Sequence, residues 1–254
     1  MLTTALALPL WLCSPTADRP GLVSAGNVDG VLTWELGALE PGGSTRHVLL
    51  FAFDESHDSL LARMSQARTQ FATGADPSPV DSDAPPEKAW IDNDATDFAL
   101  ERTGYFSWRS VRQALRCDRG GQLSQYSYYV HWRDGDGEHR AGNPYHEEET
   151  PENLRVLEPM RAAGPREAWG LVETADGALR IRVRALPGEG GCVAVEFVLT
   201  NAGAERLDAL RFSTYANLEA NHDHDNDLSL LDADLGGVLV IDPPTGRCVT
   251  LGAL

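Results

Sequence analysis

The stretch from Gly177 to Leu210 has the clearest backbone pattern in the chain, because apolar side chains there alternate with basic ones. The alternating positions are Leu179, Arg180, Ile181, Arg182, Val183 and Arg184. A period of two is typical of a strand with one buried and one solvent-facing side. The turn Pro187–Gly191, a second apolar run at Cys192–Thr200, the turn Asn201–Gly203 and a third run at Leu207–Tyr215 follow. This order predicts an antiparallel meander.

Other parts of the chain also have strand character, and many of these runs end at Asp-Gly turns. The expected strands are Gly30–Leu36, His47–Phe53, Thr96–Leu100, Ser124–Trp132, Trp169–Glu173 and Gly237–Ile241. One short helix is expected near residues 58–71, where Leu60, Leu61, Met64, Ala67 and Phe71 form an apolar stripe. The segment from Asp134 to Arg161 is expected to be mostly loop. Together these patterns predict an all-β fold, an antiparallel β-sandwich.

A Pro-, Asp- and Ser-rich segment at 75–86 has no periodicity and predicts an exposed linker. It divides the chain into residues 1–74, with the first strands and the helix, and residues 87–254, the main β-sandwich region. The apolar segment Leu2–Cys13 has no Lys or Arg before it and a poor cleavage pattern after it. We therefore expect a buried strand there, with a signal peptide as the alternative.

Charge and cysteine spacing exclude several classes of protein. The 254 residues include 21 Lys and Arg against 38 Asp and Glu, a formal net charge of −17, which disfavours nucleic acid and anionic membranes as partners. The chain has no apolar run long enough for a membrane span, so we expect no membrane insertion. The four cysteines show no CxxC spacing, which argues against a zinc ribbon or a thioredoxin-like site.

Two segments together resemble the Ig-like β-sandwich repeat modules of bacterial surface and adhesion proteins. Val193–Glu219, with its Thr-Asn-Ala-Gly turn, resembles the opening strands of such a module, and Leu32–Phe53, with Trp-Glu-Leu-Gly-Ala-Leu-Glu-Pro-Gly, resembles the closing strands. The halves stand in inverted order, and Met1–Ala7 can be aligned with Cys248–Leu254. The resemblance implies a sandwich that is permuted or cut within a repeat, in which the strands of Gly30–Phe53 pair with Val193–Thr200. It also implies an extracellular or cell-surface location.

A second resemblance is to the supersandwich domains of sugar-active enzymes. These domains also have long hairpins, like the one at Trp169–Leu199, and loops rich in aromatic residues. This resemblance implies an activity on polysaccharide, or association with an enzyme that has one.

The densest polar cluster, Asn221–Asp227, has the oxygen-ligand spacing of a calcium loop. The predicted calcium ligands are Asp223, Asp225, Asp227 and Asp234. Leu228 occupies the sixth position, where an EF-hand has glycine, so we expect a looser calcium site rather than an EF-hand. The alternative is a hydrated acidic loop. His222 and His224, two residues apart, are a weaker candidate pair of transition-metal ligands.

Aromatic residues form a second cluster between Tyr105 and Trp132. The predicted ligand-binding residues are Tyr105, Trp108, Tyr126, Tyr128 and Trp132, whose rings could stack on a sugar. With a period of two, Tyr126, Tyr128 and Val130 lie on one strand face and Tyr129 and His131 on the other. Packing in the core is the alternative for these rings, since aromatic residues are common in strands.

The sequence contains no GxSxG, HExxH, phosphate-loop or GxGxxG motif, so no catalytic residue is predicted. The function expected from these features is that of a non-catalytic extracellular β-sandwich module, structural or carbohydrate-binding and stabilised by calcium. Its partners would be carbohydrate or neighbouring modules of the same assembly. The alternative is a polysaccharide-active enzyme or an enzyme-associated supersandwich domain.

Overall fold

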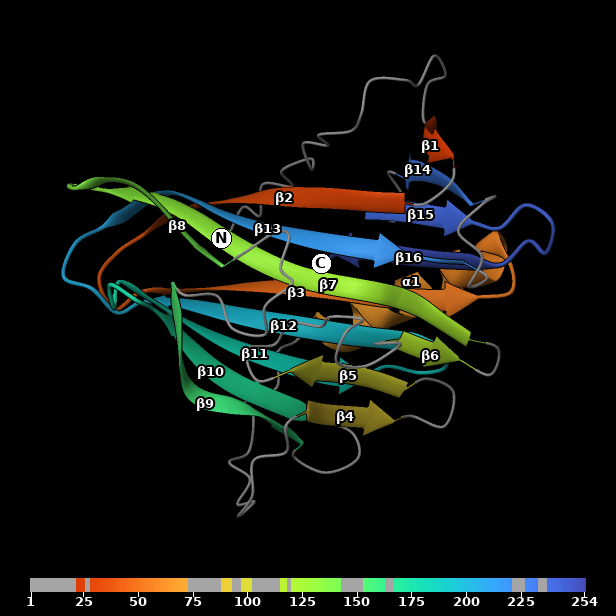
Figure 1. Cartoon of the computed structure of the whole chain (residues 1–254), viewed down its shortest axis with the longest axis horizontal. Helices are drawn as coiled ribbons and strands as arrows, with labels where there is room; N and C mark the ends of the chain where they lie inside the picture. The colour runs from red at the N-terminus through yellow and green to blue at the C-terminus, as the bar shows by residue number, and fades with distance from the viewer. Residues whose placement is uncertain are drawn as a thin grey trace.

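Two antiparallel sheets face each other across an apolar core in the computed structural model of the chain (Figure 1). The structure describes residues 22–25, 28–72, 88–92, 97–101, 115–117, 120–142, 153–162, 167–220, 227–232 and 237–254. The nine-stranded sheet has the order β1 (Leu22–Ala25), β14 (Leu228–Asp232), β15 (Gly237–Ile241), β16 (Cys248–Ala253), β3 (Ser44–Asp54), β12 (Cys192–Asn201), β11 (Leu179–Pro187), β10 (Ala168–Thr174) and β9 (Leu154–Ala162). The seven-stranded sheet has the order β2 (Val28–Leu39), β13 (Leu207–Leu218), β7 (Gly120–Asp134), β6 (Leu115–Cys117), β5 (Asp97–Glu101) and β4 (Lys88–Asp92), with β8 (Gly137–Gly142) paired to β7. The predicted all-β sandwich is therefore confirmed.

The first strands of the chain are built into the sheets of the last ones. β3 lies between β12 and β16, with Leu49 opposite Val195 on one side and Ala253 on the other. β2 pairs with β13, where Trp34 faces Phe212. The expected pairing with Val193–Thr200 is thus found for β3, whereas β2 lies in the other sheet and pairs with β13. The proposed linker at 75–86 and the segment Met1–Ala7 lie outside the described residues.

The core between the sheets is lined by the inward-facing positions of the long strands. Tyr126, Tyr128, Phe197 and Phe212 are each fully buried there, and the ring centroids of Tyr128 and Phe197 lie 4.9 Å apart. Aromatic pairs at this separation stabilise a core beyond the area they bury. Asn201 connects the two sheets at one end, because its side-chain amide donates to the carbonyl of Leu39 at 2.9 Å.

Helix α1 (His57–Phe71) covers part of the outer face of the nine-stranded sheet. Its N-cap is Ser56, whose hydroxyl accepts the Ser59 N–H at 3.3 Å. The apolar stripe Leu60, Met64, Ala67 and Phe71 is buried against the outward side chains of β3, β12 and β16. The helix predicted near 58–71 is confirmed. It lies beside β3 and β16 and away from β9 (Figure 1), and the apolar cluster that it covers extends to Leu186 at the end of β11.

The segment Asp134–Arg161 differs from the sequence prediction, because it contains the strand β8 and most of the edge strand β9. The alternation in β9 is broken by a register shift opposite Leu171, and Pro159 lies within the strand. Proline has no N–H to donate and is found mainly on edge strands. An interior proline and an irregular register both remove the period-two pattern on which a strand prediction depends.

Candidate functional site

The predicted aromatic platform divides between the core and the undescribed part of the chain. Tyr126 and Tyr128 are 0% exposed and Trp132 is 3% exposed, so these three rings pack in the core as the alternative interpretation held. Tyr105 and Trp108 lie outside the described residues. The predicted alternation along β7 is found, since Tyr129 and His131 point to the other side and are only partly buried.

Of the four predicted calcium ligands, only Asp227 is described. It is 1% exposed, and one of its carboxylate oxygens accepts the backbone N–H of Ala220 at 2.9 Å. Asp223, Asp225 and Asp234 lie outside the described residues, as do His222 and His224. Among the residues that the structure describes, no group of three His, Cys, Asp or Glu side chains could hold a metal ion.

The outer face of the seven-stranded sheet presents a row of charged and aromatic side chains. Arg211 on β13 faces Glu35 on one side and His131 on the other, and His131 in turn faces Arg140. The Tyr129 ring is covered by the guanidinium of Arg140, 5.4 Å from its centroid. Burial lowers the pKa of His131, and the positive charges of Arg140 and Arg211 lower it further.

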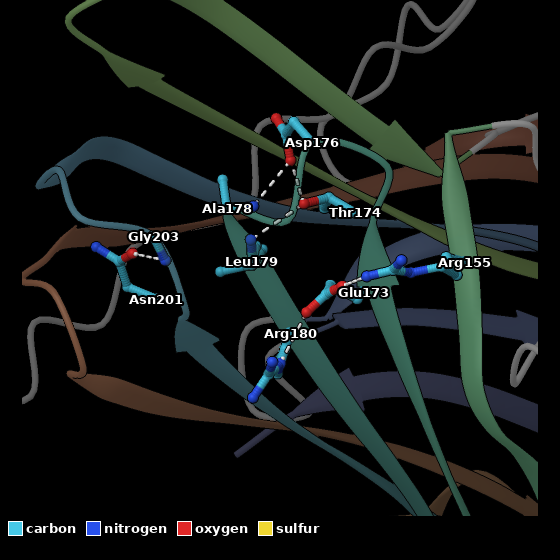
Figure 2. Close-up of polar contacts among 9 residues, drawn as sticks. All are labelled: Arg155, Glu173, Thr174, Asp176, Ala178, Leu179, Arg180, Asn201 and Gly203. Atoms are coloured by element: carbon cyan, nitrogen blue, oxygen red, sulfur yellow. Dashed lines mark hydrogen bonds and ion pairs between the residues drawn. The ribbon is translucent and has the colours of Figure 1, made fainter.

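A second polar surface lies on the outer face of β9, β10 and β11. Which of its residues face one another depends on the register of β10 against β11, and the turn between these strands sets that register. Gly177 adopts φ +75°, a conformation that glycine takes without strain. The Asp176 carboxylate accepts the Ala178 N–H at 2.9 Å, and the Thr174 hydroxyl accepts the Leu179 N–H at 3.0 Å. Figure 2 shows this turn above the strands that it aligns. The turn places Glu173 opposite Arg180.

Glu173 is held between two arginines, one from each neighbouring strand (Figure 2). Arg180 Nε donates to Glu173 Oε1 at 2.8 Å, and Arg155 of β9 donates to the other carboxylate oxygen. The hydrogen bonds from Arg180 and then Arg155 hold the pKa of the Glu173 carboxyl below its usual value of 4.5. The glutamate side chain is 5% exposed, whereas Arg155 and Arg180 are 66% and 53% exposed. These three residues therefore expose the guanidinium groups of the two arginines to solvent and bury the carboxylate of Glu173.

Further along this face, Trp169 lies between two more arginines. Arg161 of β9 stacks its guanidinium over the indole ring, 4.5 Å from the centroid, and pairs with Glu158 at 3.0 Å. Arg184 of β11 faces Trp169 on the other side and pairs with Glu167 at 2.6 Å. The indole ring is partly exposed.

Three N–H donors on this face are buried and have no acceptor among the described residues. They are Arg161 Nε, Trp169 Nε1 and Arg182 Nε. A buried donor without an acceptor costs about 1–3 kcal/mol relative to one that is hydrogen-bonded. We refer to the surface formed by Arg161, Trp169, Leu171 and Arg182 as the β9–β11 surface.

Sequence reasoning did not single out the β9–β11 surface as a site. The alternation of Arg180, Arg182 and Arg184 identified a strand and placed the three arginines on one side of it. Trp169 joins them only through the pairing of β10 with β11, and Arg161 only through the pairing with β9. The outward repetition of arginine in a chain of net charge −17 was the available signal.

Two cysteine thiols lie in the described part of the helix-covered cluster. Cys192 and Cys248 are free and buried beneath helix α1. Burial raises the pKa of Cys192 to about 12, opposed by the charge of Arg63, and raises the pKa of Cys248 to about 11 together with the charge of Asp54. Thiols of this kind are protonated at neutral pH and are poor nucleophiles.

No family model matches the chain, and no curated protein or solved structure matches it. The resemblances to Ig-like repeat modules and to supersandwich domains therefore stay predictions. Among the described residues, no helix has the length and apolar character needed to cross a bilayer.

Proposed function

We propose that the protein is a non-catalytic, extracellular β-sandwich module that binds carbohydrate through the β9–β11 surface. The observation that carries this proposal is the partly exposed Trp169 ring, which is accompanied on the same sheet face by three N–H donors without acceptors in the described chain. Sugars offer both a C–H face that stacks on an aromatic ring and hydroxyl oxygens that accept hydrogen bonds. The apolar cluster beneath helix α1 extends to Leu186 of β11 and includes none of the four residues of the β9–β11 surface.

The position of Trp169 on a paired strand also favours binding. β10 is paired with β9 on one side and with β11 on the other. A side chain on such a strand is held more rigidly than one on a loop, so little conformational entropy is lost when a ligand binds. Arg161 holds one face of the ring by its stacked guanidinium. The indole is therefore oriented before the ligand arrives.

Titration of the purified protein with a panel of soluble neutral and acidic polysaccharides, followed by calorimetry, tests the proposal. Trp169→Ala is expected to weaken binding at least tenfold, and Trp169→Phe, which keeps an aromatic ring but removes the N–H donor, is expected to weaken it less. Tyr129→Ala is the matched control, because Tyr129 is a partly buried aromatic residue on the outer face of the other sheet.

Each other outcome has a defined meaning, provided that the variants keep the wild-type melting temperature within a few degrees. A loss of binding in Tyr129→Ala but not in Trp169→Ala would move the site to the seven-stranded sheet and overturn the proposal. Release of shorter chains from the bound polysaccharide would favour the alternative, a polysaccharide-active enzyme. Absence of binding to every polymer would contradict a carbohydrate-binding role.

A further inference from the structure

The three arginines of β11 point outward in succession, but they are not equally neutralised. Arg180 is paired with Glu173, and Arg184 with Glu167. Arg182, between them, has no ion-pair partner in the described part of the chain, and its buried Nε has no acceptor there. In a protein with 38 acidic residues and 21 basic ones, an arginine left without a carboxylate is unexpected. Its position is therefore suited to a negative charge from outside the chain.

The residues directly opposite Arg182 on its two neighbouring strands are apolar. The register places Val198 of β12 on one side of it and Leu171 of β10 on the other. A guanidinium between aliphatic side chains is less exposed to water, so its interaction with an anion is screened less than that of a fully solvated arginine. The fork of N–H donors matches the two oxygens of a carboxylate.

Trp169 lies within reach of the same ligand. It faces Arg184, the residue two positions after Arg182 on β11, so Trp169 and Arg182 are diagonal neighbours on one sheet face. Diagonal neighbours in an antiparallel pair are about 7–8 Å apart. One end of a small ring can stack on the indole while a carboxylate on that ring extends to the guanidinium.

We infer that the β9–β11 surface selects carboxylated sugars, with Trp169 stacking on a uronic acid ring and Arg182 binding its carboxylate. This inference rests on the proposed carbohydrate-binding function and adds the chemical class of the ligand. The net charge of −17 does not oppose it for a short oligosaccharide, because charges beyond about 8 Å are largely screened at physiological ionic strength.

The test compares oligogalacturonate with the same oligosaccharide converted to its methyl ester, which removes the charge and keeps the rings. The wild-type protein is expected to bind the carboxylated form at least tenfold more tightly, and sodium chloride is expected to weaken binding of that form only. Arg182→Gln is expected to remove the preference, while Arg182→Lys, which keeps the charge but loses the fork, is expected to retain part of it. Arg206→Gln is the matched control, since Arg206 is an exposed arginine paired with Glu40 and Asp208 elsewhere on the surface.

The outcomes separate this inference from the proposed function. Equal binding of the two forms, unchanged in Arg182→Gln, would overturn the inference and leave carbohydrate binding intact. Binding of polyglutamate that depends on Arg182, without binding of either oligosaccharide, would retain carboxylate recognition but overturn its assignment to sugars. Binding of none of the three probes would overturn both proposals.

Discussion

Glu173 on β10 faces Arg180 on β11, and Arg180 Nε donates to its carboxylate at 2.8 Å. With Arg155 on the other side, this arrangement lowers the pKa of Glu173 in the folded state. A lowered folded-state pKa stabilises the fold above the unfolded value of 4.5, and this contribution is lost as the pH falls through the folded-state pKa. Water screens the pair because both guanidinium groups are more than half exposed.

Glu173→Gln is therefore expected to lower the free energy of unfolding by only about 1 kcal/mol at pH 7, as for a partly screened ion pair. The difference between the two proteins should shrink towards zero at pH 3 and below. Urea denaturation at both pH values measures it. A difference that does not change with pH would mean that packing, and not charge, accounts for the loss.

His47 gives a second pH dependence of stability. Its ring is buried between Trp34 and Phe212, with centroids 4.7 and 4.8 Å away, and burial lowers its pKa from 6.5 to about 3. The unfolded chain then binds a proton below pH 6.5 that the folded chain does not bind until about pH 3, so acidification destabilises the fold. His47→Gln, which does not titrate, should lose about 2 kcal/mol less than the wild type between pH 7.5 and pH 5. Parallel losses in the two proteins would show that His47 is not the group responsible.

Ala209 has a left-handed backbone conformation, with φ 50°, where β13 changes register against both of its neighbours. A residue with a Cβ atom is strained in this region by about 1 kcal/mol, whereas glycine is not. Ala209→Gly is expected to raise the free energy of unfolding by about 1 kcal/mol, less the entropy that glycine adds to the unfolded chain. Ala202→Gly, in the exposed turn after β12, is a control that should not stabilise.

Alkylation with iodoacetamide at pH 8 should leave Cys192 and Cys248 unmodified in the folded protein. Both thiols are buried, with pKa values raised to about 12 and about 11. In urea, the same residues should react at the rate of free cysteine. Mass-spectrometric mapping of the labelled peptides distinguishes them from the other two cysteines, and rapid labelling of Cys192 in native conditions would contradict its position beneath helix α1.

Calcium binding stays a prediction of the sequence. Millimolar calcium is expected to raise the melting temperature, because a cation that binds only the folded form stabilises it by mass action. Asp225→Asn should reduce that response. An unchanged melting curve and no calorimetric heat would leave the acidic segment as a hydrated loop.

Much of the fold could be predicted from local patterns. The alternation at Leu179–Arg184 predicted both the strand β11 and its two faces, and the spacing of Leu60, Met64 and Phe71 predicted the helix and its buried side. These patterns depend on neighbours a few residues apart. β9 was missed because Pro159 and a register shift interrupt its alternation.

The candidate site could not be predicted in the same way. The period of β7 correctly separated Tyr128 from Tyr129, but it could not indicate which of the two faces is inward, since both carry aromatic rings. Likewise, Trp169 and Arg182 become neighbours only through the register of β10 against β11, which the Asp176 turn establishes. Proximity of this kind is a property of strand pairing, and a single sequence does not display it.

The position of β3 between β12 and β16 has a consequence during synthesis on the ribosome. Ser44–Asp54 leaves the ribosome long before either of its partners, and most of its side chains are apolar on both sides. Until the C-terminal third of the chain has emerged, this strand has two unpaired edges and no sheet to join. The nascent chain must therefore be kept from associating through β3 with its neighbours on the same polysome, and expression at low temperature or with a holding chaperone should raise the soluble yield.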